Sequence, residues 1–388
     1  MIQNLKYSVG ADISKEKFDA CISVINTLQN TVVKASKTFK NNTSGIKEFI
    51  LWINKHKKEE IPLVITAEAT GVYYELFAIT IYEHGYNISV VLPNKSRRYL
   101  QSKGYKSKND KIDAKGLSEM GAEQNLTKWE PFSKNIYVLR SLTRQNEDLQ
   151  TIKTTITNRM EANKSSGYKS EFIENQLVNM LKSINKHIKE VKDQIQKLIE
   201  GNEILKNKIP KICKVKGLGI LTVATIVAET NGFKLIQNQR QLVSYAGYDI
   251  IENQSGKRSG KTKISKKGNS HIRRALHMPA LSVVKYKQAG FNHLYNRVFI
   301  RTAIKMKGYV AVQRKLLILI YTLWKKDEEY DPNYLIRKDI TFGDEESKFL
   351  FSLNSEGVDK KVGDQKSPTQ DKLPYDVSPE VLFSLVQK

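Results

Sequence analysis

Cysteine is scarce in this chain, and long apolar runs are absent. Only two of the 388 residues are cysteines, Cys21 and Cys213, and they stand far apart without ligand-like spacing. Disulfide scaffolds and zinc fingers are therefore not expected. The first residues lack the apolar core of a signal peptide, and the longest aliphatic stretch, Leu316 to Trp324, is about half a membrane span. We expect a soluble, cytoplasmic protein without a membrane partner.

Acidic residues are too few to balance the basic ones. Lys and Arg number 64 against 40 Asp and Glu, which gives a formal net charge of +24. An excess of this size indicates a polyanionic partner. Binding to a membrane surface would also explain it, but the sequence shows neither the basic amphipathic helices nor the lipidation signals of that class. The length allows two or three domains.

The first third of the chain has the patterning of an α/β domain. Apolar alternation and helical periodicity predict strands at 7–13, 18–25, 32–39, 63–66 and 87–92, and helices at 44–57, 72–84, 94–103 and 110–124. Three antiparallel-type strands, followed by a helix–strand alternation, form the order of a ribonuclease-H-like domain. In that fold the first and fourth strands are neighbours, and a late helix packs across them.

Four acidic residues stand near the ends of these elements. Asp12 is near the end of the first strand, Glu68 follows the fourth, and Asp110 and Asp113 share one face of a helix. Their convergence would be electrostatically costly unless cations were bound. Oxygen ligands select hard ions, so Mg²⁺, or else Mn²⁺, is the expected cofactor. Each acid could instead be a surface or capping residue, as Asp110 would be at a helix N-cap.

Residues 134–200 have the pattern of a long helical hairpin. Apolar residues in the second arm alternate steps of four and three, a heptad seam made of Leu177, Leu181, Ile184, Ile188, Val191, Ile195 and Leu198. The first arm repeats more weakly, and the turn is expected at residues 165–167. Such an antiparallel coiled coil could be an intramolecular spacer or a contact between protomers.

A Gly-x-Gly segment follows the hairpin. Lys216, Gly217 and Gly219 lie between two short apolar helical stretches, as in a helix-hairpin-helix motif whose glycines let backbone N–H groups approach a phosphate. An ordinary turn between two helices would have the same pattern.

The segment 255–274 carries eight Lys and Arg residues and no acid. Its glycines let the backbone approach a nucleic-acid strand, and its cations neutralise phosphates. Ser255 could be a nucleophile if a cation or metal lowered its effective pKa, or it could be a phosphate contact or a turn residue. The expected nucleic-acid contacts are Arg97, Arg98, Lys108, Lys216, Gly217, Gly219, Lys257, Arg258, Lys261, Lys263, Lys266, Lys267, Arg273 and Arg274.

Taken together, these motifs resemble the DEDD transposases of the IS-one-ten family of bacterial insertion sequences, including its IS-one-eleven-eleven branch. The matching stretches in the first half are 9–15, 68–73 and 110–114. Those in the second half are 215–219, 242–247, 254–256, 264–269 and 307–316. The resemblance covers residues 1–330, and it is the joint order of the motifs that makes it specific.

The resemblance implies a RuvC-like DEDD domain at 1–130, a coiled-coil hairpin at 131–203 and a mostly helical transposase domain at 204–330. It implies that Asp12, Glu68, Asp110 and Asp113 bind Mg²⁺ and that Ser255 forms a covalent bond to a DNA 5′-phosphate. Expected partners are donor and target DNA, a structured noncoding bridge RNA and further copies of the chain, as a dimer to tetramer, with the active protein associated with the nucleoid.

The sequence departs from the family pattern at two places and is also consistent with two other functions. Residues 248–251 depart from the family's usual Leu-x-Pro pattern, so Ser259 and Ser244 remain alternative nucleophiles. The segment 331–388 holds four of the nine prolines and lies outside the resemblance; we expect a polar, mobile tail of unknown role. A Holliday-junction-type nuclease using metal-activated water, or a non-catalytic nucleic-acid-binding protein, would also explain the basic surface.

Overall fold

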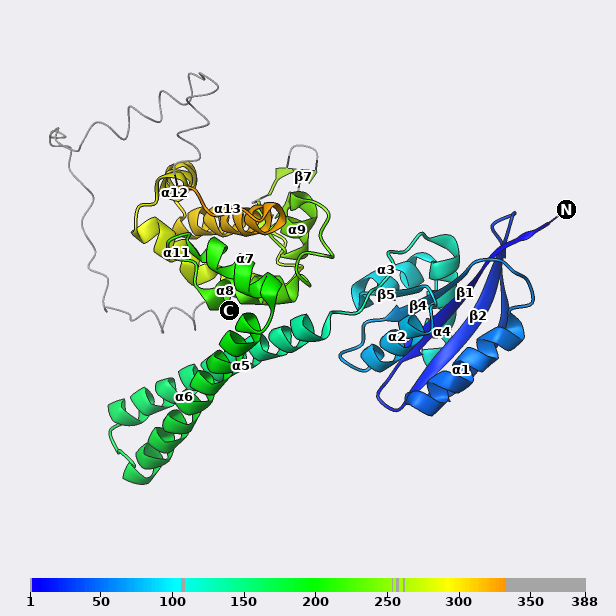
Figure 1. The fold of residues 1–388 in the computed structure, drawn as a ribbon, viewed down its shortest axis with the longest axis horizontal. Coiled ribbons are helices and arrows are strands. Elements are labelled where there is room, and N and C mark those ends of the chain that lie inside the picture. The colour runs from blue at the N-terminus through cyan, green and yellow to red at the C-terminus, as the bar shows by residue number, and fades with distance from the viewer. Residues whose placement is uncertain (1, 106–108, 253, 256–257, 261, 333–388) are drawn as a thin grey trace, which may run out of the picture. The chain divides into compact units, whose positions relative to one another are not determined.

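The computed structural model describes residues 2–105, 109–252, 254–255, 258–260 and 262–332, and it divides into two compact units (Figure 1). Unit 1 is Met1–Phe132 and unit 2 is Ser133–Lys388. The helical hairpin, which the sequence suggested as a separate domain, belongs to unit 2. The expected tail lies almost wholly outside the described residues, and so do Lys108, Lys257 and Lys261.

Unit 1 is built on a five-stranded mixed sheet in the order β3-β2-β1-β4-β5. Its strands are β1 (Asn4–Ile13), β2 (Lys17–Asn26), β3 (Thr31–Lys40), β4 (Leu63–Glu68) and β5 (Ile88–Val91). β1, β2 and β3 pair antiparallel, whereas β4 is parallel to both β1 and β5. The first and fourth strands are therefore neighbours, as the sequence predicted.

Helices cover the two faces of this sheet in different ways. They are α1 (Thr43–His56), α2 (Tyr74–Glu83), α3 (Pro93–Ser102) and α4 (Asp110–Glu123). One sheet face forms an aromatic core with α1 and α2, in which the Phe18 ring lies 5.3 Å from Phe49 and 4.9 Å from Phe77. The other face carries α4, which packs against β1, β2 and β4.

Gly10 sets how closely α4 approaches the sheet. A Cβ atom at this position would lie 2.0 Å from the Ala114 carbonyl oxygen and 2.2 Å from the Ser118 nitrogen, both backbone atoms of α4. Since a backbone cannot rotate away as a side chain can, any larger residue must push the helix off the sheet.

We expect Gly10→Ala to destabilise unit 1 by about 2–4 kcal/mol through this overpacking. Urea unfolding followed by circular dichroism would measure the change. Gly167→Ala is the matched control, because a Cβ at this position meets nothing within 4 Å. The free energy of unfolding of this variant should hardly differ from that of the wild type. Equal effects of the two substitutions would contradict the close approach of α4.

Unit 2 begins with two long helices, α5 (Lys134–Ser165) and α6 (Glu171–Glu200), which pack along each other. Figure 1 shows them side by side, joined at one end by a short turn. Three residues of the predicted seam, Leu177, Ile188 and Ile195, are buried in α6, and Leu149 and Ile156 are buried in α5. The pairing as a helical hairpin is observed, and coiled-coil packing stays a prediction.

The rest of unit 2 is a helical core with a few very short strands. Its helices are α7 (Glu203–Cys213), α8 (Ile220–Glu229), α9 (Gln239–Tyr245), α10 (Ser270–Ala275), α11 (His277–Lys285), α12 (Ala289–Thr302) and α13 (Lys305–Lys326). The core includes several buried aliphatic and aromatic side chains of α8 and α13. Among the described residues no helix is long and apolar enough to cross a bilayer.

Candidate functional site

Helix α4 runs antiparallel to β1, and their contacts follow a regular register. Ser8 and Ser118 exchange side-chain-to-backbone hydrogen bonds of 2.7 and 2.8 Å. Two residues further along β1, Gly10 lies against the Ala114 carbonyl, four residues earlier in α4. Two strand residues advance by about 6.6 Å and four helix residues by about 6 Å. Contacts between β1 and α4 therefore recur at every second strand residue and every fourth helix residue.

One more step of this register brings the predicted acids together. It moves from Gly10 to Asp12 on the strand, and from Ala114 to Asp110 on the helix, with Asp113 in the same first turn. Asn109 caps α4 by accepting a hydrogen bond from the Ile112 N–H at 2.9 Å, which fixes where this turn begins. Asp110 is therefore the first helical residue and not the N-cap considered from the sequence.

Glu68 reaches the same place from the other side of β1. The parallel register pairs Ala11 with Ala67, so Asp12 and Glu68 are the next residues on their strands. The Ser96 hydroxyl of α3 donates a 2.5 Å hydrogen bond to Glu68 Oε2. Ser96 is itself buried, and this contact holds the Glu68 carboxylate at the edge of the sheet.

Electrostatics indicate that the four carboxylates lie near one another. Burial and, in decreasing order, the negative charges of Asp113, Glu68, Asp110 and a fifth acid, Asp19, together raise the pKa of Asp12 to about 6. Because each of these neighbours is an anion, the ionised form of Asp12 is disfavoured in the protein without a cation. A divalent cation would remove this penalty.

The sequence analysis did not identify Asp19 or its neighbours. Asp19 lies directly opposite Asp12 in the β1–β2 hairpin and is only 5% exposed. It accepts a 2.5 Å hydrogen bond from the Thr38 hydroxyl, and Lys17 Nζ lies 3.6 Å from its other oxygen. The short charged turn between the two strands could have identified Asp19, because a tight hairpin at this turn places Asp19 opposite Asp12.

The donor set suits a hard divalent cation, since it consists of carboxylate oxygens. Within the described residues, however, no three acidic, histidine or cysteine side chains are already arranged to hold an ion. The backbone brings the carboxylates into one neighbourhood, and rotation about their side-chain torsions would have to complete the coordination.

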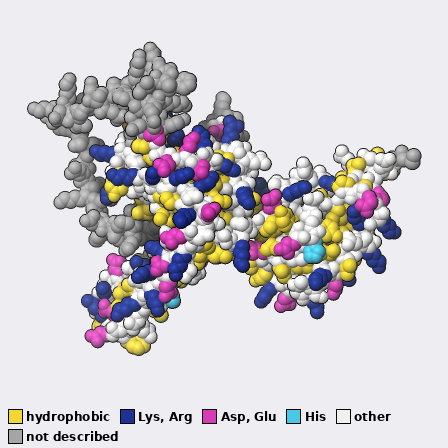
Figure 2. Space-filling model, in the orientation of Figure 1, with side chains coloured by type: hydrophobic (Ala, Val, Ile, Leu, Met, Phe, Trp, Pro, Cys, Tyr) yellow, Lys and Arg dark blue, Asp and Glu magenta, His cyan; other side chains and the backbone are white. Residues whose placement is uncertain are grey.

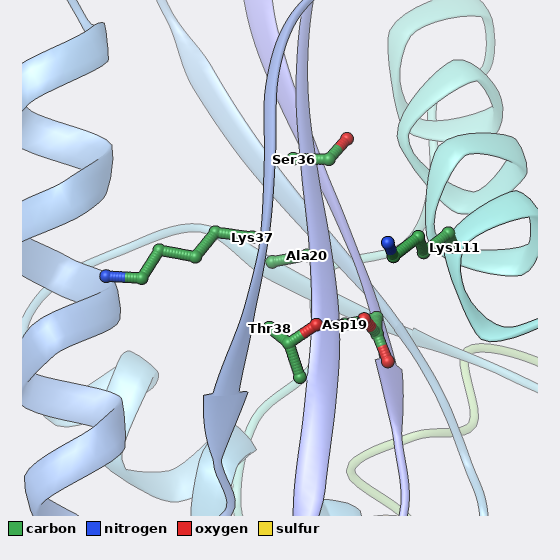
Figure 3. A pocket seen from close by; sticks show the side chains of 6 residues that line it. All are labelled: Asp19, Ala20, Ser36, Lys37, Thr38 and Lys111. Carbon is green, nitrogen blue, oxygen red and sulfur yellow. Dashed lines mark hydrogen bonds between the residues drawn. The ribbon is translucent and has the colours of Figure 1, made fainter.

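A polar cavity of about 300 Å³ lies beside Asp19, between β2, β3 and α4 (Figure 3). Ser36, Thr38 and Lys111 line it together with Asp19. Figure 3 shows Lys111 extending from α4 on the side of Asp19, whereas Lys37 points to the opposite side of the sheet. The carboxylate cluster is therefore flanked by hydroxyl and ammonium donors.

Ser255 lies in unit 2, on a small β-hairpin. β7 (Gln254–Ser255) pairs with β8 (Arg258–Ser259), so that Ser255 is opposite Arg258. β6 (Ile250–Ile251) pairs with β9 (Lys263–Ile264) at the base of the same excursion. The backbone thus carries Ser255 and the alternative Ser259 on one hairpin, while the third candidate, Ser244, lies in α9.

A buried carboxylate anchors the chain that follows this hairpin. Glu229, 2% exposed, accepts two hydrogen bonds from the Arg144 guanidinium at 2.7 and 2.9 Å and one from the Asn269 amide at 2.7 Å. Burial alone would raise the pKa of Glu229, but these donors outweigh it and hold the pKa below its usual value. Glu229, at the end of an apolar run, was also not identified from the sequence.

Two glycines let this anchored loop fold tightly. Gly247 has a φ of +75°, and a Cβ at Gly268 would lie 2.5 Å from the Gly247 nitrogen. The Asn269 N–H donates to the Tyr245 carbonyl at 2.8 Å, which joins the two segments. These positions fall in the stretches 242–247 and 264–269 that carried the family resemblance.

Comparison with known proteins identifies the family. Residues 9–163 match the model of a DEDD transposase family, described as "Transposase", and residues 210–296 match the model of the "Transposase IS116/IS110/IS902 family". A "Pilin gene-inverting protein" of Moraxella bovis is 30% identical over 327 residues, which cover 84% of this chain and 98% of that protein. The chain belongs to the IS116/IS110/IS902 transposase family. The "Pilin gene-inverting protein" of Moraxella lacunata matches this chain at the same identity and coverage.

Among solved structures, the chain has weak structural similarity to RuvC of Thermus thermophilus. The TM-score is 0.25 at 10% identity, covering 32% of this chain and 99% of that one. The same protein in complex with a Holliday junction substrate gives a TM-score of 0.24.

The predicted nucleic-acid contacts of this transposase occupy different environments. Arg97, Arg98, Lys216, Gly219, Lys263, Lys266 and Lys267 are exposed, and Gly217 is half-buried with a φ of +101° between α7 and α8. Figure 2 shows Lys and Arg side chains on the visible faces of the described surface. Arg273, in contrast, donates to the Ala246, Gly268 and Asn269 carbonyls, and Arg274 pairs with Glu147. Arg273 therefore also stabilises the loop, whereas Arg274 connects α10 to α5.

Proposed function

We propose that this transposase catalyses DNA strand exchange in which Ser255 attacks a phosphodiester bond and the acids Asp12, Glu68, Asp110 and Asp113 hold Mg²⁺. The observation that carries the proposal is the β1–α4 register, which brings acids about a hundred positions apart to one end of the sheet. Membership of a transposase family supports DNA as the substrate.

In this mechanism the chain's own groups position the reactants. The Ser255 hydroxyl attacks phosphorus, the leaving group is a DNA 3′-oxygen, and the serine becomes bonded to the 5′-phosphate. A later attack by a DNA 3′-hydroxyl reverses the step and releases the serine. The bound ions would polarise the phosphate and stabilise the attacking and leaving oxygens. The exposed cations of unit 2 would hold the strand through its phosphates.

We further propose the partners that the family resemblance implies. These are donor and target DNA, a structured guide RNA and other copies of the chain, with the metal cluster of one protomer acting on the serine of another. RNA that copurifies with the protein, when sequenced, would test for the guide.

Ser255→Ala should abolish the covalent protein–DNA adduct and lower strand exchange by about a thousandfold or more, because the nucleophile is lost. Trapping on a nicked substrate whose cleaved strand is labelled at its 3′ end, followed by denaturing electrophoresis, measures the adduct. Ser259→Ala and Ser244→Ala are the matched controls and should still form it. Full DNA cleavage by Ser255→Ala without an adduct would instead indicate a nuclease that uses water.

A further inference from the structure

Lys17 is a cation already seated on the carboxylate cluster. Its Nζ donates to Asp110 Oδ2 at 3.2 Å and lies 3.6 Å from Asp19 Oδ2. Asp19 is fixed in turn by the Thr38 hydroxyl at 2.5 Å, so a chain of contacts runs from β3 through β2 to the first turn of α4. The hydrogen bond to Asp110 raises the pKa of Lys17, and Asp19 raises it further.

The Lys17 contact conflicts with a metal at the same acid. A lysine ammonium donates hydrogen bonds and cannot share a carboxylate lone pair with a metal ion. In addition, a like charge a few ångströms away disfavours a divalent cation. Asp110 can therefore hold Lys17 or coordinate an ion through Oδ2, but the two states compete. Lys17 is free to move, since its side chain is 52% exposed.

We propose that Lys17 is a resident counter-cation which a divalent metal must displace from Asp110, and which then contacts a phosphate of the bound nucleic acid. The inference rests on the proposed metal cluster and adds an exchange step to it. Without metal, Lys17 neutralises part of the acidic cluster. With metal bound, its ammonium is released beside the path of the polyanion, where phosphate oxygens are the nearest new acceptors.

Two other lysines of unit 1 provide controls. Lys111 also lies beside the cluster but forms no ion pair with the described residues, so it reports the general effect of a nearby charge. Lys37 points to the opposite side of the sheet, where its ammonium lies 5.0 Å from the Phe39 ring. A specific exchange at Asp110 predicts a change for Lys17 that neither control reproduces.

The experiment is a Mn²⁺ titration of the purified full chain without DNA, followed by calorimetry and by electron paramagnetic resonance of free Mn²⁺. Lys17→Met should tighten binding by about 5–20-fold, the size of one relieved charge contact near a protein surface. Lys111→Met should change it by less than about threefold, and Lys37→Met by less than about twofold. Lys17→Arg, which restores a cation, should return affinity to near that of the wild type.

DNA binding with metal present tests the second half of the exchange. The slope of log affinity against log salt should fall by about 0.7–0.9 for Lys17→Met, the loss of one phosphate contact, and should be unchanged for Lys37→Met. Unchanged Mn²⁺ affinity, or an unchanged slope, in Lys17→Met would overturn the exchange while leaving the metal cluster intact. If the wild type showed no Mn²⁺ binding that Asp12→Ala removes, the cluster and the exchange would both be wrong.

Discussion

Replacing Asp12 by asparagine should abolish strand exchange and yet make the metal-free protein more stable. Activity should fall by about a thousandfold or more, because the proposed metal ion at Asp12 would supply several kcal/mol of transition-state stabilisation. Stability at pH 7.5 in EDTA should rise by about 1–2 kcal/mol after allowance for solvent screening, since the variant removes a charge that its neighbours disfavour. Urea unfolding and a strand-exchange assay measure the two effects.

The pH dependence of this stability follows from the raised pKa of Asp12. Its folded-state pKa is about 6 against an ordinary value of 3.8, so between these values the folded protein binds more protons than the unfolded chain. Asp12 therefore contributes less to stability as pH rises through this window, and the contribution is lost above pH 6. The advantage of Asp12→Asn should shrink as pH falls toward 4. If Asp12→Asn were less stable than the wild type at pH 7.5 in EDTA, the repulsion between Asp12 and the neighbouring acids would be contradicted.

Glu229→Ala should be among the most destabilising single substitutions in unit 2, at about 2–3 kcal/mol. It removes a buried carboxylate that accepts hydrogen bonds from Arg144 and Asn269, and hydrogen bonds to a charged group contribute about 1.5–3 kcal/mol. Thermal unfolding of the full chain would show the loss. Strand exchange should fall as well, because Asn269 anchors the loop that follows the Ser255 hairpin.

Glu190→Ala provides the comparison for Glu229→Ala. Glu190 also forms ion pairs, with Lys186 and His187, but its side chain is 53% exposed on the helical hairpin. Exposed pairs of this kind contribute about 0–0.5 kcal/mol. Similar losses for the two variants would mean that burial of the Glu229 network does not contribute to stability.

Much of unit 1 could be predicted because its local patterns agree with its tertiary contacts. The predicted strand at 63–66 and helix at 110–124 correspond to β4 and α4, and β1 and β4 are neighbours as expected. Asp19 and Lys17 could not be singled out in the same way. Their importance depends on cross-strand pairing and on a helix that packs over the hairpin, and neither contact is visible in a run of neighbouring residues.

In unit 2, too, some features could be predicted from the sequence and others could not. The heptad spacing predicted two long helices, because every residue of the seam contributes to one local periodicity. Glu229 had no such signal, since the sequence placed it simply at the end of an apolar run. Its partners Arg144 and Asn269 are 85 and 40 positions away, and only packing brings them to it.

The sequence by itself determined the charge, the order of helices and strands, and the four acids with their family motifs, because these depend on composition and short-range spacing. Tertiary structure alone decided that Gly10 lets α4 lie close enough to bring Asp110 and Asp113 near Asp12. It also decided that Asp19 and Lys17 join them. The physical reason is that strand register and helix packing set distances between residues that no sequence separation encodes.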